Sequence, residues 1–298
     1  MTGRLKALCF GTLLAMAAAS AEAACALRIE RAETAAWNAG GGYDVFARNG
    51  IAERFELEVR RVDADTAPCD AVVTLRPEGR PRLVQGGQSL AYALRPAAPR
   101  ALLDGGTVTL RGEDLLPEDV LRLDYEIVLL PGQVVAAGRY RGGLIAEVRR
   151  ESGSLQELED SAQIAVTARV RSNARIAFAG TSGRRQTVDF GELTEGKTPN
   201  ITPQILVQST SNFSLSVTSE NRGALAQSTG DWRVPYAASI AGQPLSLERG
   251  TQRLDFRGPT ADARRLPIEF RILRGERRRA GLYRDTVTIV VTPEGAGF

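Results

Sequence analysis

The chain has 298 residues, of which 43% are hydrophobic and 24% are charged, and its formal net charge is only +3. So small a charge excess gives no basis for binding nucleic acid or another polyanion. The sequence contains no histidine, so the most common general base is missing, and no Ser–Lys or paired-carboxylate motif has a context that indicates catalysis. We therefore expect a protein that is not an enzyme and that binds no cofactor or metal.

Residues 1–23 have the pattern of a secretory signal peptide. Arg4 and Lys6 form the charged end, an apolar run covers 7–19, and 21–23 has the small residues of a cleavage site. The run is too short to span a bilayer, and no later segment has enough unbroken apolar residues to do so. We predict that the chain is exported.

Two of the three cysteines are expected to form a disulfide. Cys9 falls in the signal peptide, which leaves Cys25 and Cys69 in an oxidising compartment, where an even pair usually bonds. In the chain-entropy model, closing that loop stabilises the fold by about 4 kcal/mol.

Residues 24–150 alternate short strands with turns rich in glycine, proline and aspartate. Apolar residues recur at every second position, as in Phe55, Leu57 and Val59. Such spacing is typical of an all-β sandwich. The next stretch, 151–160, is polar and small, and we predict that it is a linker to a second domain over 161–298.

The end of the chain repeats its middle. Residues 280–291 match residues 137–148 without a gap, since both contain Ala-Gly-x-Tyr-Arg and end in valine. Tyr92 and Tyr236 match further upstream at nearly the same offset. Similarity at one long period indicates two copies of one domain rather than a solenoid of short repeats. The predicted fold class is therefore all-β, with two tandem sandwiches.

Two motifs in the second copy allow a comparison with a known family. They are Asp-Phe-Gly-Glu-Leu-Thr-Glu-Gly at 189–196 and Ala-Gly-x-Tyr-x-Asp-Thr-Val at 280–287. With them the chain resembles the spore coat protein U domain family, the subunits of archaic chaperone–usher pili. The first copy departs from the closing motif at Gly142 and Gly143, where Asp-Thr would be expected.

The resemblance implies immunoglobulin-like sandwiches, the C-terminal one lacking its last strand. A periplasmic chaperone would fill the resulting groove first, an outer-membrane usher would assemble the fibre, and the next pilus subunit would then insert its donor strand. An open edge of this kind would otherwise aggregate. The groove residues, which the alternation of the last strand places on one face, would be Tyr283, Val287, Ile289 and Val291.

A strongly alternating strand, 161–171, precedes the second copy. Its apolar residues have two open interpretations: they fill the groove of the first copy from within the same chain, or they lengthen the first strand of the second copy. The residues concerned are Ile164, Val166, Ala168 and Val170.

The position of Cys25, directly after the cleavage site, leaves no N-terminal segment to donate. We therefore expect this subunit to accept a strand and to end a fibre, as a tip adhesin exported through the periplasm to the cell surface. Its first domain would contact a target through loops at its far end, with the apolar segment 97–103 and Trp37 as candidates. The three arginines at 277–279 are more typical of a solvated hairpin end. The alternative is a secreted structural coat or matrix protein that never joins a pilus.

Overall fold

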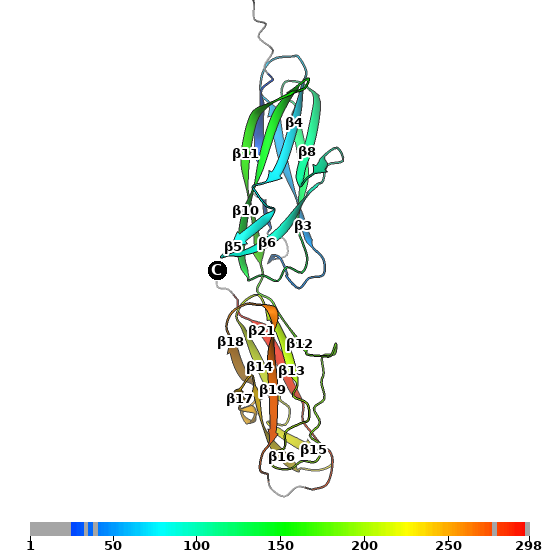
Figure 1. Ribbon diagram of the computed structural model, residues 1–298, viewed down its shortest axis with the longest axis vertical. Helices are drawn as coiled ribbons and strands as arrows, with labels where there is room; N and C mark the ends of the chain where they lie inside the picture. Colours follow the sequence, from blue (N-terminus) through cyan, green and yellow to red (C-terminus); the bar gives the residue numbers. More distant parts are fainter. Residues whose placement is uncertain (1–24, 33–34, 38–40, 276–278, 296–298) are drawn as a thin grey trace, which may run out of the picture.

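The computed structural model describes residues 25–32, 35–37, 41–275 and 279–295. Two β-sandwich domains stand end to end along the long axis of the molecule (Figure 1). The predicted signal peptide, 1–23, lies outside the described residues. In the part of the chain that is described, no helix is long and apolar enough to cross a membrane.

The first domain comprises the strands that precede residue 171. Its inward-facing positions are those of the alternating apolar pattern, so Leu57, Val59, Tyr125 and Ile127 are all buried. The strands are β1 (Leu27–Ala32), β2 (Ala35–Trp37), β3 (Ile51–Arg61), β4 (Cys69–Pro77), β5 (Arg82–Gln85), β6 (Gln88–Pro96), β7 (Leu102–Asp104), β8 (Thr107–Leu115), β9 (Val120–Leu129), β10 (Gly138–Ser152) and β11 (Leu155–Val170).

The second domain follows directly and has its own core. Phe213 and Phe256 stack there with ring centroids 5.0 Å apart. A short 3-10 turn, η2 (Leu247–Arg249), lies among its strands. The strands are β12 (Ala174–Phe178), β13 (Gln204–Ser209), β14 (Phe213–Ser219), β15 (Ala224–Gln227), β16 (Arg233–Ile240), β17 (Gln243–Leu245), β18 (Gln252–Phe256), β19 (Thr260–Ile272), β20 (Tyr283–Arg284) and β21 (Val287–Pro293).

The two domains share one strand order. The first runs β1-β3-β9-β6-β5-β10-β4-β8-β7, and the second runs β12-β13-β19-β16-β15-β20 in one sheet and β18-β14-β21 in another. Strand β10 therefore corresponds to β20 and β21 together, which pass from one sheet to the other. The first domain has β11 in addition, and the described residues of the second domain contain no counterpart to it. The predicted fold class is confirmed.

The predicted disulfide is present. Cys25 precedes β1 and Cys69 opens β4, and the bond joins them across a sequence separation of 44. Asp70, the residue after Cys69, lies opposite Glu151 near the tip of the β10–β11 hairpin, so the bond lies at the end of the first domain that is far from the second.

The segment predicted as a linker, 151–160, is instead the tip of a hairpin. Strands β10 and β11 pair from Gly138↔Val170 up to Ser152↔Leu155. The polar composition that suggested a linker serves cross-strand ion pairs, because Arg150 contacts both Glu157 and Glu159. The domain boundary therefore falls at residues 171–173, between β11 and β12, and not at 161.

Candidate functional site

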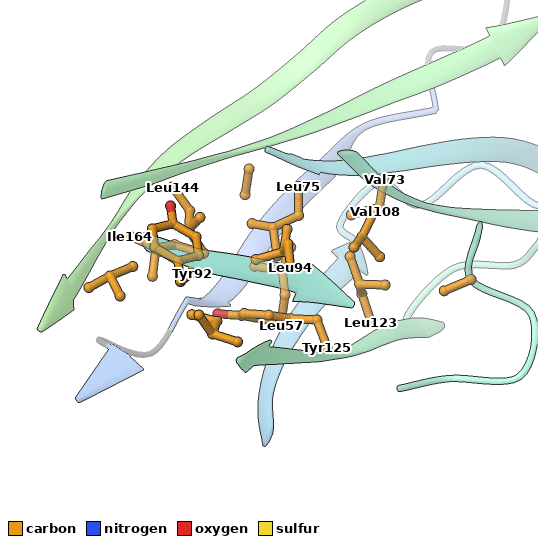
Figure 2. Packing of buried hydrophobic residues seen from close by; sticks show 14 of the residues in the cluster. Leu57, Val73, Leu75, Tyr92, Leu94, Val108, Leu123, Tyr125, Leu144 and Ile164 are labelled. Carbon is orange, nitrogen blue, oxygen red and sulfur yellow. The ribbon is translucent and has the colours of Figure 1, made fainter. Parts of the chain in front are cut away.

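The last strand of the first domain, β11, closes that sandwich. It pairs antiparallel with β10 along its length and parallel with β2 at Val166–Ala168. Figure 2 shows Ile164 beside Leu144 among the core side chains. This is the arrangement of the first interpretation given above, since β12 begins only at Ala174. The inward side chains of β11, at most 2% exposed, are Ile164, Val166, Ala168 and Val170.

The corresponding edge of the second domain has no such strand. Strand β21 pairs antiparallel with β14, from Val287↔Ser219 to Pro293↔Phe213, and with no other strand in the described residues. On the other side, β12 pairs only with β13 among the described strands. Strands β12 and β21 approach one another without forming a ladder. No described strand of this chain lies between them, where β11 lies in the first domain.

The inward side chains of β10 in the first domain are more deeply buried than the matching side chains of β21 in the second domain. Three side chains of β10 are 0% exposed: Leu144, Ala146 and Val148. The matching side chains of β21 pack against the second core but are only partly buried: Val287, Ile289 and Val291. Burying such side chains fully is worth about 1.5–3 kcal/mol each, so an added strand at this edge would gain apolar contact.

The opposite wall of this site comes from β12 and the loop after it. Ile176 and Phe178 are partly buried against the second core, as is Phe190, which meets Phe270 edge to face at 6.3 Å between ring centroids. The apolar residues of this wall were not among the predicted groove residues, although the alternation of Ile176 and Phe178 was a usable signal in the sequence. We call the following residues the open edge: Ile176, Phe178, Val287, Ile289 and Val291.

The outer face of β21 alternates with the open edge. Thr288, Val290 and Thr292 point away from the core, and Val290 is 51% exposed. β-Branched residues on both faces favour an extended backbone. On its free side the strand therefore presents N–H and C=O groups in the geometry that another strand would bind.

A carboxylate fixes the point where β20 passes into β21. Asp285 accepts hydrogen bonds from the Ser219 hydroxyl at 2.6 Å and from the Asn221 backbone N–H at 2.9 Å. It also accepts bonds from the Thr286 backbone N–H and from the Tyr236 hydroxyl. Burial and the bond to Asp285 raise the pKa of Tyr236 above its usual value, so this hydroxyl stays protonated and continues to donate at neutral pH.

Tyr283, which was predicted to line the groove, lies just before this point. It belongs to β20 and pairs with Gln227 of β15, and its hydroxyl donates to the Arg279 carbonyl at 2.8 Å. Its ring packs partly against the second core. Tyr283 is therefore beside the start of the open edge rather than along β21.

The contact segment predicted for the far end of the first domain, 97–103, lies on the flank. Its exposed leucines belong to β7, which pairs with the first residues of β8. The far end of the first domain is reached only by the last residue of β8, Leu115, which lies opposite Cys69. The side chain of Trp37 and residues 277 and 278 lie outside the described residues. Other large apolar side chains are exposed at the far end, and we call them the distal apolar group: Val62, Leu116, Leu155 and Leu158.

No protein-family model matches the chain, and no curated protein matches it in sequence. The resemblance to the spore coat protein U domain family therefore rests on the two motifs alone.

Several solved structures are distantly similar to this chain. One is a chain of the CsuC–CsuE chaperone–tip adhesion subunit pre-assembly complex from archaic chaperone–usher Csu pili of Acinetobacter baumannii, at 16% identity over 89% of this chain and 99% of that one, with a TM-score of 0.46. CfaE, the adhesive subunit of CFA/I fimbria of enterotoxigenic Escherichia coli, is 11% identical over 85% of this chain and 77% of its own, with a TM-score of 0.39. The CssB subunit of enterotoxigenic Escherichia coli, complemented with a donor strand from CssA, covers 49% of this chain and 97% of its own at 13% identity and a TM-score of 0.27. The chain is similar to these proteins, and the likeness is distant in both sequence and superposition.

Proposed function

We propose that this protein is the terminal, adhesive subunit of a chaperone–usher pilus, and that its second domain accepts a donor strand at the open edge. The observation that carries the proposal is the contrast between two copies of one domain. Where β11 is present, the inward side chains of β10 are fully buried, and where no strand follows, those of β21 are only partly buried. A strand from another chain would complete the second domain as β11 completes the first.

The direction of β21 supports placing this subunit at a fibre end. Strand β21 runs toward the junction with the first domain, where the Glu294 N–H donates to the Asn212 carbonyl and the neighbouring Thr210 carbonyl accepts from Ala137 of the first domain. A donor strand antiparallel to β21 would leave the second domain at its opposite pole, as β11 leaves the first domain toward the second. The rest of the fibre then lies beyond the second domain, and the first domain points outward.

The same edge explains why other proteins would be needed before assembly. A strand with an unpaired side and partly buried valine and isoleucine invites pairing between copies. We assign a periplasmic chaperone to cover the open edge first, with an usher to exchange it for the donor strand of the next subunit. The first domain needs no such partner, because β11 already occupies that position.

A single charge tests this proposal. Ile289→Asp places a carboxylate in the open edge, where an inserted strand would have to bury it without a partner. We expect at least a tenfold loss of copurification with a coexpressed periplasmic chaperone and a similar loss of surface display, since about 1.4 kcal/mol already corresponds to tenfold.

Val290→Asp is the matched control, because it adds the same charge one residue along on the outward face. It should leave chaperone capture and display close to those of the unaltered protein. If Ile289→Asp is captured and displayed as well as Val290→Asp, the open edge is not an acceptor, and a secreted coat or matrix protein becomes the better interpretation.

A further inference from the structure

The hydrogen bonds around Asp285 join three strands at the start of the open edge. Ser219 ends β14, Tyr236 belongs to β16, and Asp285 precedes β21, so one carboxylate links both sheets of the second domain. With the backbone N–H groups of Asn221 and Thr286, it accepts four bonds and so satisfies both of its oxygens. Bonds to an ionised carboxylate are stronger than bonds between neutral groups.

The first domain has the same backbone at this point, but of the polar side chains around Asp285 it keeps only the tyrosine. The Glu78 N–H donates to the Gly143 carbonyl at 2.9 Å, and in the second domain the Glu220 N–H donates to the Thr286 carbonyl at the same distance. The ladders place Pro77 opposite Leu144 and Ser219 opposite Val287, which fixes the correspondence of the two domains. The substituted pairs are Ser219 with Pro77, Asn221 with Gly79, and Asp285 with Gly142, while Tyr236 and Tyr92 are both tyrosine.

We call the hydrogen bonds that Asp285 accepts the clamp. The first domain, whose last strand is part of the same chain, thus lacks the clamp, and the second domain, which has the open edge, has it. In the first domain, β11 pairs with β10 at Gly142 and Gly143, and β4 pairs with the other side of β10 from Leu144 onward. Strand β10 is therefore held from both sides. Strand β21 is held in the described residues by β14 alone. A strand paired on one side opens locally at low cost unless something fixes its end.

We infer that Asp285 is a positioning residue that holds β21 in register before the donor strand arrives, an inference that rests on the proposed function of the open edge. Fixing the acceptor in its bound conformation reduces the ordering that strand insertion would otherwise require. Once the strand is in place, its own ladder holds β21, and the clamp becomes largely redundant.

Two forms of the full chain test this. One is the unaltered protein, probed with a synthetic peptide copy of residues 161–171. The other carries the same copy fused after Phe298 through a short glycine–serine turn, which completes the second domain from within. Each form is made with Asp285→Asn and, as a matched control in the first domain, with Tyr92→Phe.

In the form without the fused strand, we expect Asp285→Asn to weaken peptide binding about tenfold, because the amide nitrogen of asparagine cannot accept the hydrogen bonds that one carboxylate oxygen accepts. In the fused form, the same change should lower the melting temperature of the second domain by less than half of the drop seen without the fused strand. Tyr92→Phe should leave peptide binding unchanged, and it should leave the melting temperature of the second domain unchanged in both forms.

Three outcomes are distinguishable. A loss of affinity together with a small effect in the fused form supports the inference. If Asp285→Asn lowers the melting temperature equally in both forms and leaves peptide affinity unchanged, Asp285 is an ordinary structural residue, and the open edge remains an acceptor. If the unaltered chain neither binds the peptide nor gains stability from the fused copy, the proposed function is wrong, and the inference is overturned with it.

Discussion

At the scale of single residues, the far end of the first domain is organised by a buried arginine. Arg61 is 1% exposed, and its guanidinium donates to both carboxylate oxygens of Asp63 and to the carbonyls of Ala67 and Asp65, both at 2.6 Å. Asp63 also accepts from the Ala26 N–H at 2.7 Å, next to the disulfide. The start of β1 and the loop before β4 are thus tied to one ion pair.

The pH dependence of this ion pair is testable. Hydrogen bonding to Arg61 holds the pKa of Asp63 well below its usual range. Its stabilising contribution is therefore fully present above about pH 4, the ordinary pKa of aspartate, and is lost as the pH falls further toward the folded-state pKa. Asp63→Asn should lower the free energy of unfolding of the first domain by about 2–3 kcal/mol at pH 7, because it removes the carboxylate that is hydrogen-bonded to the buried Arg61 guanidinium and leaves the more distant charges of Asp65 and Asp119.

Denaturant unfolding at pH 7 and pH 3 measures both effects. The difference in unfolding free energy between Asp63→Asn and the unaltered protein should be smaller at pH 3, because Asp63 then begins to bind a proton in the unfolded state while it stays ionised in the folded state. A constant difference between the two proteins at both pH values would contradict this assignment.

The sequence revealed some of these residues and not others. Cys25 and Cys69 were predictable as a pair, because only two cysteines remain after the signal peptide. Arg61 was not, since a lone arginine in a charged stretch has the same pattern whether it is solvated or buried. Asp285 was visible only as part of a motif, because its partners Ser219 and Tyr236 come from strands far away in sequence.

At the scale of elements, β11 separates what the sequence could predict from what it could not. Its buried half alternates clearly, so the strand itself was predictable, but alternation does not say which sandwich receives it. Its outer half, at 155–160, lies in an exposed hairpin, and exposed strands carry the polar residues of a linker. Pairing with β10 over the whole length settles both points.

A matched pair of substitutions tests the role of β11 in the first domain. Val166→Ser removes a fully buried side chain and places a hydroxyl in the core, while Ala165→Ser changes the neighbouring exposed position. We expect the first to lower the free energy of unfolding of the first domain by about 2–4 kcal/mol and the second by less than about 0.5 kcal/mol. Chemical denaturation followed by circular dichroism measures both. Equal effects would mean that β11 packs loosely and does not complete the sandwich.

At the scale of the whole molecule, the two domains are joined by a short connection and contact each other directly. Only residues 171–173 separate β11 from β12. Across the junction, the Asn173 side chain donates to Asp44 at 2.9 Å, the Ala137 N–H donates to the Thr210 carbonyl at 2.7 Å, and Arg175 lies over the ring of Phe46 at 4.8 Å. This junction sets the open edge of the second domain and the far end of the first apart along one axis (Figure 1). The two ends can therefore carry different tasks.

The distal apolar group makes this division testable. Leu155 and Leu158, at the β10–β11 hairpin, are 74% and 50% exposed, and Leu102 and Leu103, on the flank, are 68% and 50% exposed. Two leucine pairs of nearly equal exposure thus differ chiefly in position.

If the far end makes first contact, Leu155→Ser with Leu158→Ser should reduce attachment of displayed protein to alkyl-coated glass by about tenfold or more, since burying leucine is worth about 1.5–3 kcal/mol. Leu102→Ser with Leu103→Ser should leave attachment nearly unchanged, and both double variants should be displayed equally, because neither touches the open edge. A larger loss from the flank pair would move the contact surface to β7 and would make the far end a structural cap.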